Sequence, residues 1–425
     1  MNSKFKQELP KLIKQGVISE EIASKIESYY NSNSVNSSNK LFTVFGVIGS
    51  LLVGLGIILI LAHNWDNFST LTKTIFAFLP LIIGQIAVGY SILKKKSSTW
   101  LESSGTFLFF AVGSSISLVS QIYNIPGNLS SFLLAWILLC LPLVYLLKSN
   151  FVFNLCLIFS TVYAYELGYD YSSGYKTPWM YLGVIAGLMP FYINNLKHKI
   201  EENITTVSNF LIPLSVVISF GTFVKGDYQI YIIVYGFLFG FLYNVGKLTL
   251  FKNTRIRKNG FLLFGSLGLI IMMLTMSVKG FWNDNFLTLE IQNQSLLVSI
   301  VLLISTVFLL IYNKKTSKFS WNSLFEYASI LILLIYFLND IDGYLSIILA
   351  NIIIFILGVG MIKKGTDTTN FGILNYGLLI ITALISLRFF DTEMTFVIRG
   401  LLFISVGVGF FASNYLMLKK SRKNA

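Results

Sequence analysis

The stretch LAHNWDNF, residues 61–68, places four chemically different side chains next to one another. His63 supplies an imidazole, Asn64 an amide, Trp65 an indole and Asp66 a carboxylate. This mixture could bind a carbohydrate or a lipid head group through hydrogen bonds and aromatic contact. The run also directly follows a long apolar segment, where Trp commonly marks the membrane–water boundary and Asn or Asp begins the next helix. The residues therefore predict either a binding site or a helix end at the membrane surface.

A second polar stretch, SQIYNIPGN, ends the third long apolar segment at residues 120–128. Its candidate ligand-binding side chains are Gln121, Tyr123 and Asn124, together with Ser117 one turn before them in the apolar segment. Within the segment, small and polar residues recur at helical spacing, so that one face of the helix carries Thr106, Gly113, Ser117 and either Ser120 or Gln121. Such a face favours close packing against another helix, and the alternative is that it lines a hydrated cavity.

Two charged residues near the ends of apolar segments complete the set of candidates. Glu166 and Arg399 both fall at predicted outer ends, where a long cationic side chain can reach the interface. Arg399 is interpreted either as an interfacial anchor or as a counter-ion for Asp66, Glu166, Asp391 or Glu393. Three amides, Gln85, Asn351 and Asn375, lie inside apolar segments, and each needs a buried partner or a cavity.

Several catalytic signatures do not occur in the sequence. It holds no GxxxxGK[ST] phosphate loop and no GxSxG serine motif. The two histidines, His63 and His198, fall on opposite sides of the predicted membrane, so they cannot form a paired metal site. We expect no cofactor and no bound metal, and we regard an intramembrane enzyme as the weakest of the functional hypotheses.

Composition identifies the class of protein that must position these residues. Of 425 residues, 55% are hydrophobic and 12% are charged, whereas soluble domains carry about 25% charged residues. The apolar residues form runs of about 20, the length that crosses a hydrocarbon core as a helix. The sequence therefore predicts an all-α polytopic membrane protein with about fourteen spans, at residues 41–62, 72–93, 103–122, 129–147, 150–168, 178–195, 204–224, 228–245, 260–279, 293–312, 322–339, 342–362, 371–388 and 394–418.

The distribution of basic residues predicts the orientation of these spans. If both termini are cytoplasmic, only six of the 32 Lys and Arg residues fall on the outer side, namely Lys73, Lys176, Lys225, Lys279, Arg388 and Arg399. Acidic residues divide almost evenly between the two sides. A bias confined to Lys and Arg follows the positive-inside rule. The net charge of +13 thus indicates contact with an anionic inner leaflet, and no nucleic-acid partner is expected.

Regions outside the apolar runs complete the predicted organisation. Residues 1–30 are expected to form a cytoplasmic helical hairpin, in which Gly16 ends the first helix and Ser19 caps the second. Residues 31–40 read as a flexible polar linker, and residues 419–425 as a basic cytoplasmic tail. The membrane part divides at about residue 150 into spans one to four (41–150) and spans five to fourteen (150–418).

Four features in order carry a resemblance to a known family. They are the hairpin LIKQGVISEEIASKI, the Gly-rich span ending in LAHNWD, the stretch SQIYNIPGN, and the span LLAWILLCLPLVYLLKS. Over about residues 5–150, the sequence resembles bacterial multi-pass membrane proteins of domain-of-unknown-function family 2157. The C-terminal helix RGLLFISVGVGFFASNYLMLKK is also similar to that of long members. The resemblance implies a bacterial inner-membrane location and supplies no catalytic residues.

The function that we expect from these features is a permease- or flippase-like handling of a neutral or polar solute or a lipid. Its basis is the number of spans, the polar third span and the polar–aromatic residues gathered at the predicted outer surface. The alternative is a non-transporting envelope scaffold or sensor that binds a protein partner through its cytoplasmic hairpin.

Overall fold

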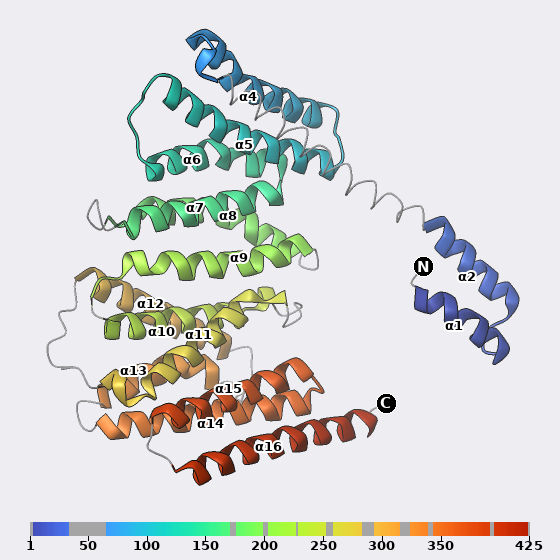
Figure 1. Cartoon of the computed structure of the whole chain (residues 1–425), viewed down its shortest axis with the longest axis vertical. Coiled ribbons are helices and arrows are strands. Elements are labelled where there is room, and N and C mark those ends of the chain that lie inside the picture. The colour runs from blue at the N-terminus through green and yellow to red at the C-terminus, as the bar shows by residue number, and fades with distance from the viewer. Residues whose placement is uncertain are drawn as a thin grey trace. The chain divides into compact units, whose positions relative to one another are not determined.

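The computed structural model describes residues 3–33, 65–170, 176–198, 203–226, 228–251, 258–282, 293–314, 324–338, 343–391 and 395–423. The predicted first span, most of the predicted linker, and both His63 and Asn64 lie outside these residues. By its internal contacts the chain divides into two units, residues 1–76 and residues 77–425. The described residues form helices and turns without a strand (Figure 1).

The first unit contains the predicted hairpin. Helix α1 spans Ser3–Lys14 and α2 spans Glu20–Asn33, so α2 continues three residues beyond the predicted end of the hairpin. Gly16 has a φ of +68°, a conformation that glycine adopts without steric cost after a helix. The backbone N–H of Ile22 donates to Ser19 Oγ, at 3.3 Å, as expected for an N-cap. Leu9 and Ala23 are buried between the two helices.

The remaining helices correspond one to one with the thirteen other predicted spans. They are α4 (Thr70–Leu93), α5 (Ser98–Ile122), α6 (Leu129–Leu147), α7 (Asn150–Gly168), α8 (Trp179–His198), α9 (Asn203–Phe220), α10 (Tyr228–Val245), α11 (Gly260–Met276), α12 (Asn293–Lys314), α13 (Leu324–Leu338), α14 (Gly343–Asp367), α15 (Phe371–Asp391) and α16 (Phe396–Lys423). Because α16 runs to Lys423, the predicted basic tail begins as a continuation of that helix.

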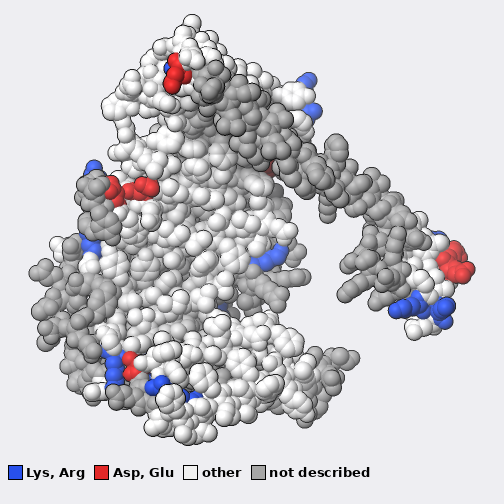
Figure 2. All heavy atoms as spheres, viewed as in Figure 1, with Lys and Arg blue, Asp and Glu red and all other residues white. Residues whose placement is uncertain are grey.

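Length and hydropathy support membrane insertion. Among the described residues, nine helices are long and apolar enough to cross a membrane: α4, α5, α6, α7, α9 with its 3₁₀ extension Gly221–Phe223, α12, α14, α15 and α16. Three apolar helices, α10, α11 and α13, are shorter. Large apolar side chains such as Ile304, Phe308 and Phe403 are exposed on the outside of these helices, where lipid can cover them. Figure 2 accordingly shows mostly uncharged surface over the described helices of residues 77–425.

Close packing inside the second unit depends on small residues. A Cβ at Gly113 would lie 2.2 Å from the indole of Trp136, and a Cβ at Gly268 would lie 2.1 Å from the ring of Phe239. Each glycine therefore allows an aromatic ring of the neighbouring helix to lie directly on the backbone. Helix α6 packs against both α5 and α7. Both cysteines, Cys140 and Cys156, are buried and free.

Candidate ligand cavity between α4, α5 and α6

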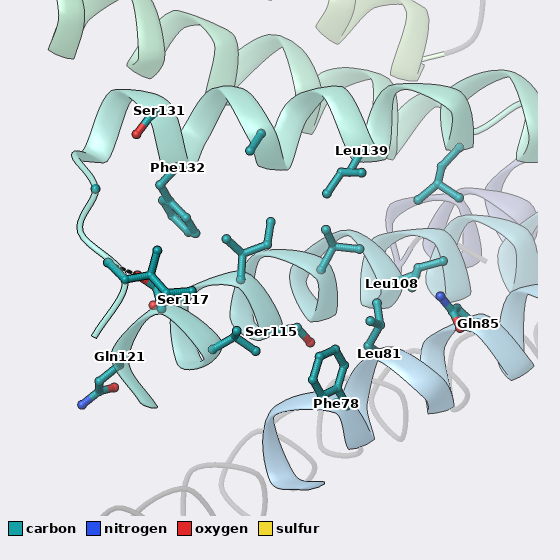
Figure 3. Close-up of a pocket in the computed structure, with 18 of the residues that line it drawn as sticks. Phe78, Leu81, Gln85, Leu108, Ser115, Ser117, Gln121, Ser131, Phe132 and Leu139 are labelled. Atoms are coloured by element: carbon teal, nitrogen blue, oxygen red, sulfur yellow. Dashed lines mark hydrogen bonds between the residues drawn. The ribbon is translucent and has the colours of Figure 1, made fainter. Parts of the chain in front are cut away.

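A cavity of about 1400 Å³ lies among α4, α5, α6 and the turn that joins α5 to α6 (Figure 3). The described residues that line it belong to the second unit, between Phe78 and Leu146. Its volume exceeds that of most pockets for small metabolites, which hold about 300–1,000 Å³. It is therefore large enough to hold a lipid or another sizeable amphiphile.

The local sequence shapes one end of the cavity. Helix α5 ends at Ile122, and Tyr123 is its C-cap residue. Asn124 follows with a φ of +50°, which turns the chain away from the helix axis. Ser120 Oγ donates to the carbonyl of Ile125 at 2.9 Å, holding this turn in place. Asn128 then caps α6 by accepting the backbone N–H of Ser131 at 2.8 Å.

The polar side chains at this end fall into two groups. Ser115, Ser120, Asn128 and Ser131 form hydrogen bonds within the protein, the first to the carbonyl of Ala77 in α4. Within the described part of the chain, Ser117, Gln121 and Asn124 have no such partner, and all three are exposed. These three side chains are therefore available to a ligand, and each can both donate and accept hydrogen bonds.

The rest of the cavity wall is apolar. Leu139, Leu143 and Leu146 of α6 face Val88 of α4 and Leu108 of α5, and they extend the cavity away from the α5–α6 turn. Among the residues that the structure describes, no Asp, Glu, Lys or Arg lines it. Gln85 lies in this apolar part, exposed and without a hydrogen-bond partner among the described residues (Figure 3). A cavity with one polar end and an apolar wall is complementary to an amphiphile, which has a polar head group and a hydrocarbon chain.

Residues on the predicted polar face of α5 have two different surroundings in the structure. Gly113 is buried under Trp136, whose indole N–H donates to the carbonyl of Phe109 at 2.7 Å. Ser117 and Gln121, one and two turns further along, line the cavity. Both sequence interpretations of this face are thus represented, close packing at Gly113 and cavity lining beyond it.

The other sequence-predicted site residues lie outside this cavity. Tyr123 is exposed next to it but does not line it. Trp65 and Asp66 belong to the first unit, where they form a short 3₁₀ helix, Trp65–Asn67, with Asp66 exposed. The ammonium group of Lys73 lies 5.8 Å from the centre of the Trp65 ring, a cation–π contact. His63 and Asn64 lie outside the described residues.

Arg399 and Glu166 lie on other helices. The guanidinium of Arg399 is 4.4 Å from the centre of the Phe389 ring. Asp391, one of its predicted counter-ions, instead pairs with Arg388, at 2.8 Å. Glu166 is half-buried in the last turn of α7. Neither residue contributes to the cavity.

The three predicted intramembrane amides have different surroundings. Gln85 lines the cavity, whereas Asn351 donates to the carbonyl of Ile347 in its own helix at 2.7 Å. Asn375 is exposed on α15. Among the described residues, no group of three or more His, Cys, Asp or Glu could hold a metal ion.

A ladder of buried hydrogen bonds between α7, α8 and α9 was not predicted. Asn195 donates to Asn150 at 2.6 Å, and Ser208 donates to Asn154 at 2.9 Å. Nearer the other end of α7, the hydroxyl of Ser215 lies 2.6 Å from that of Thr161 and 2.8 Å from that of Tyr181. The available signal was the spacing of Asn150, Asn154 and Thr161, which places the three on one helical face. Because each group has a partner, this ladder fastens the helices together.

Comparison with known proteins supports the predicted resemblance. Residues 10–153 match the model of the family described as "Predicted membrane protein (DUF2157)". This range contains α4, α5, α6 and all the residues that line the cavity. Searches of curated proteins and of solved structures gave no match.

Proposed function

We propose that the chain crosses a bacterial inner membrane about fourteen times, with both termini in the cytoplasm. Contacts between helix ends support this arrangement. Glu102 at the start of α5 accepts the N–H of Asn150 at the start of α7, at 2.9 Å, and both ends are predicted to be cytoplasmic. Gln294 at the start of α12 donates to Thr177 before α8, at 3.1 Å, and both of these ends are predicted to lie outside.

We further propose that the protein handles a lipid or another neutral amphiphile in a permease- or flippase-like manner. The observation that carries this proposal is the cavity, which combines the unpaired Ser117, Gln121 and Asn124 at one end with an apolar wall at the other. A lipid that moves between leaflets needs such a surface, because its head group must stay hydrogen-bonded while its chains stay in an apolar environment.

A lipid-flipping assay tests the proposal. The protein is reconstituted into phosphatidylcholine liposomes that carry a fluorescent lipid, and dithionite then measures how fast inner-leaflet lipid becomes accessible. We expect faster exposure with the protein than with empty liposomes. Leu139→Trp, which fills the cavity, should abolish the gain. Leu138→Trp, at a position of α6 that is also exposed but does not line the cavity, should keep it. Equal rates with and without protein would contradict flipping.

The scaffold or sensor hypothesis is favoured by one observation on the hairpin. Val17 and Ile22 are 64% and 49% exposed, although both are apolar, and such residues can bind a protein partner. If the hairpin only binds a protein partner, the Val17→Asp/Ile22→Lys variant should still flip lipid at the normal rate. A variant that flips lipid at the normal rate but no longer binds a cytoplasmic protein partner would separate the hairpin from transport.

A further inference from the structure

We infer that the cavity between α4, α5 and α6 selects an amphiphile whose head group is uncharged and bears hydroxyl groups, and that Ser117, Gln121 and Asn124 bind this head group. The inference rests on the proposed function, since it names the ligand class of the same cavity. Glycolipids and diacylglycerols share this chemistry.

The first argument is electrostatic. Among the described residues, the cavity wall holds no acidic or basic side chain, so a charged head group placed there would lose water without gaining an ion pair with them. Transfer of an unpaired ion into an apolar surrounding is strongly unfavourable, whereas a hydroxyl group requires only hydrogen bonds. Anionic phospholipids would therefore bind the cavity less well than neutral glycolipids of the same chain length.

The second argument concerns the hydrogen-bonding groups. Ser115, Ser120, Asn128 and Ser131 already bond to the protein and hold the shape of this end. The amides of Gln121 and Asn124 and the hydroxyl of Ser117 have no partner in the described part of the chain. Amides and hydroxyls donate and accept, which is the pattern that sugar or glycerol hydroxyls complement.

The third argument is positional. The three free side chains gather at the α5–α6 turn, and Leu139, Leu143 and Leu146 continue the wall along α6 from there. A ligand with its head at the turn can thus lay its hydrocarbon chain along α6. The opposite orientation would place the polar head among leucines and leave these amides facing hydrocarbon.

The experiment uses the full-length protein in phosphatidylcholine nanodiscs. Three photoactivatable lipids with the same diazirine-bearing chain are compared, one glucosyl diacylglycerol, one phosphatidylglycerol and one phosphatidylcholine. Mass spectrometry then locates the labelled peptides. We expect the glucosyl lipid to label the cavity residues of α5 and α6 about tenfold more than phosphatidylcholine, whose head group has no hydroxyl, the ratio expected from two neutral hydrogen bonds. We also expect it to label them more than phosphatidylglycerol, whose head-group hydroxyls accompany a charged phosphate.

A variant tests the assigned residues. Gln121→Ala/Asn124→Gly should reduce labelling by the glucosyl lipid about tenfold, and glycine at 124 tolerates the φ of +50°. The control Ser114→Ala/Asn375→Ala removes exposed polar groups outside the cavity and should leave labelling unchanged.

Equal labelling by all three lipids, or a preference for phosphatidylglycerol, would overturn the inference while keeping an amphiphile in the cavity. Cavity labelling by none of them, or labelling confined to peptides outside the cavity, would reject both this inference and the proposed function.

Discussion

The indole N–H of Trp136 donates a hydrogen bond to the backbone carbonyl of Phe109, at 2.7 Å, and so joins α6 to α5 in the middle of the two helices. Gly113, one turn beyond Phe109, leaves room for the ring. Beyond this contact, Ser117 and Gln121 line the cavity. The Trp136–Phe109 contact therefore fixes where α5 and α6 meet beside the cavity.

The first prediction concerns this contact. Gly113→Ala places a Cβ against the Trp136 ring, and we expect a loss of about 1–3 kcal/mol in the free energy of unfolding, as for other overpacked cores. Gly183→Ala in α8 is the matched control, because a Cβ there meets no atom within 4 Å. Thermal unfolding in detergent measures both variants. A Gly113→Ala protein as stable as the control would contradict the packing account.

The second prediction concerns Glu102. Its carboxylate accepts the hydroxyl of Ser149 and the backbone N–H groups of Asn150 and Phe151, at 2.9 and 3.1 Å, at the start of α7. A negative charge stabilises the N-terminus of a helix, so Glu102→Gln should lower stability by about 1–2 kcal/mol.

Glu166→Gln provides the control for this effect. Glu166 lies in the last turn of α7, where the helix dipole disfavours a negative charge, and its neutralisation should leave stability unchanged or slightly raised. Thermal unfolding of both variants at neutral pH gives the comparison. Equal losses for the two substitutions would show that the position relative to the helix dipole has no effect.

The third prediction concerns the buried ladder. Ser208 donates to Asn154 Oδ1, and a double-mutant cycle with Ser208→Ala and Asn154→Leu should give a coupling of about 0.6–1.7 kcal/mol, the range for hydrogen bonds between membrane helices. Steric trapping in a bilayer measures the four proteins. A coupling of zero would mean that the two side chains contribute to stability independently.

The fourth prediction concerns Gln85. In a purely structural account, Gln85→Leu would be neutral or stabilising, because it removes an unpaired amide from an apolar wall. We expect the variant to fold normally but to flip lipid several-fold more slowly. Asn375→Leu, which changes an exposed amide outside the cavity, should fold and flip lipid like the unmodified protein. A normal rate of lipid flipping in the Gln85→Leu variant would show that Gln85 does not contact the ligand during flipping.

The fifth prediction tests the proposed orientation. A cysteine at Tyr123, in the turn after α5, should react with a membrane-impermeant maleimide added to spheroplasts. A cysteine at Lys95, between α4 and α5, should react only after the membrane is permeabilised. The native Cys140 and Cys156 are buried and provide little background. The reverse pattern would place the termini outside.

The sequence contains enough information for the helices but not for the cavity. Apolar runs of membrane length predicted α4 to α16 one by one, because each helix must satisfy its own backbone hydrogen bonds in lipid. Ser117, Gln121 and Asn124 were predicted as candidates because polar side chains stand out in and beside an apolar segment. That they line a cavity with Leu139 and Leu143 depends on how far α6 diverges from α5, which no local pattern encodes.

Other features needed three-dimensional contacts. The sequence allowed Arg399 to pair with any of several acidic residues. In the structure, Asp391 pairs with Arg388, and the guanidinium of Arg399 lies over the ring of Phe389. The partner of Asn154 is Ser208, on a helix 54 residues away along the chain. Such pairings depend on helix order in space, because polar residues of many helices offer equivalent partners.

The most direct measurement is an electron cryo-microscopy structure of the protein in nanodiscs that contain glucosyl diacylglycerol. The account predicts an elongated density between α4, α5 and α6, with its head group near Gln121 and Asn124 and its chain along Leu139 and Leu143. A space between these helices that is closed by side chains, with no lipid density, would contradict it.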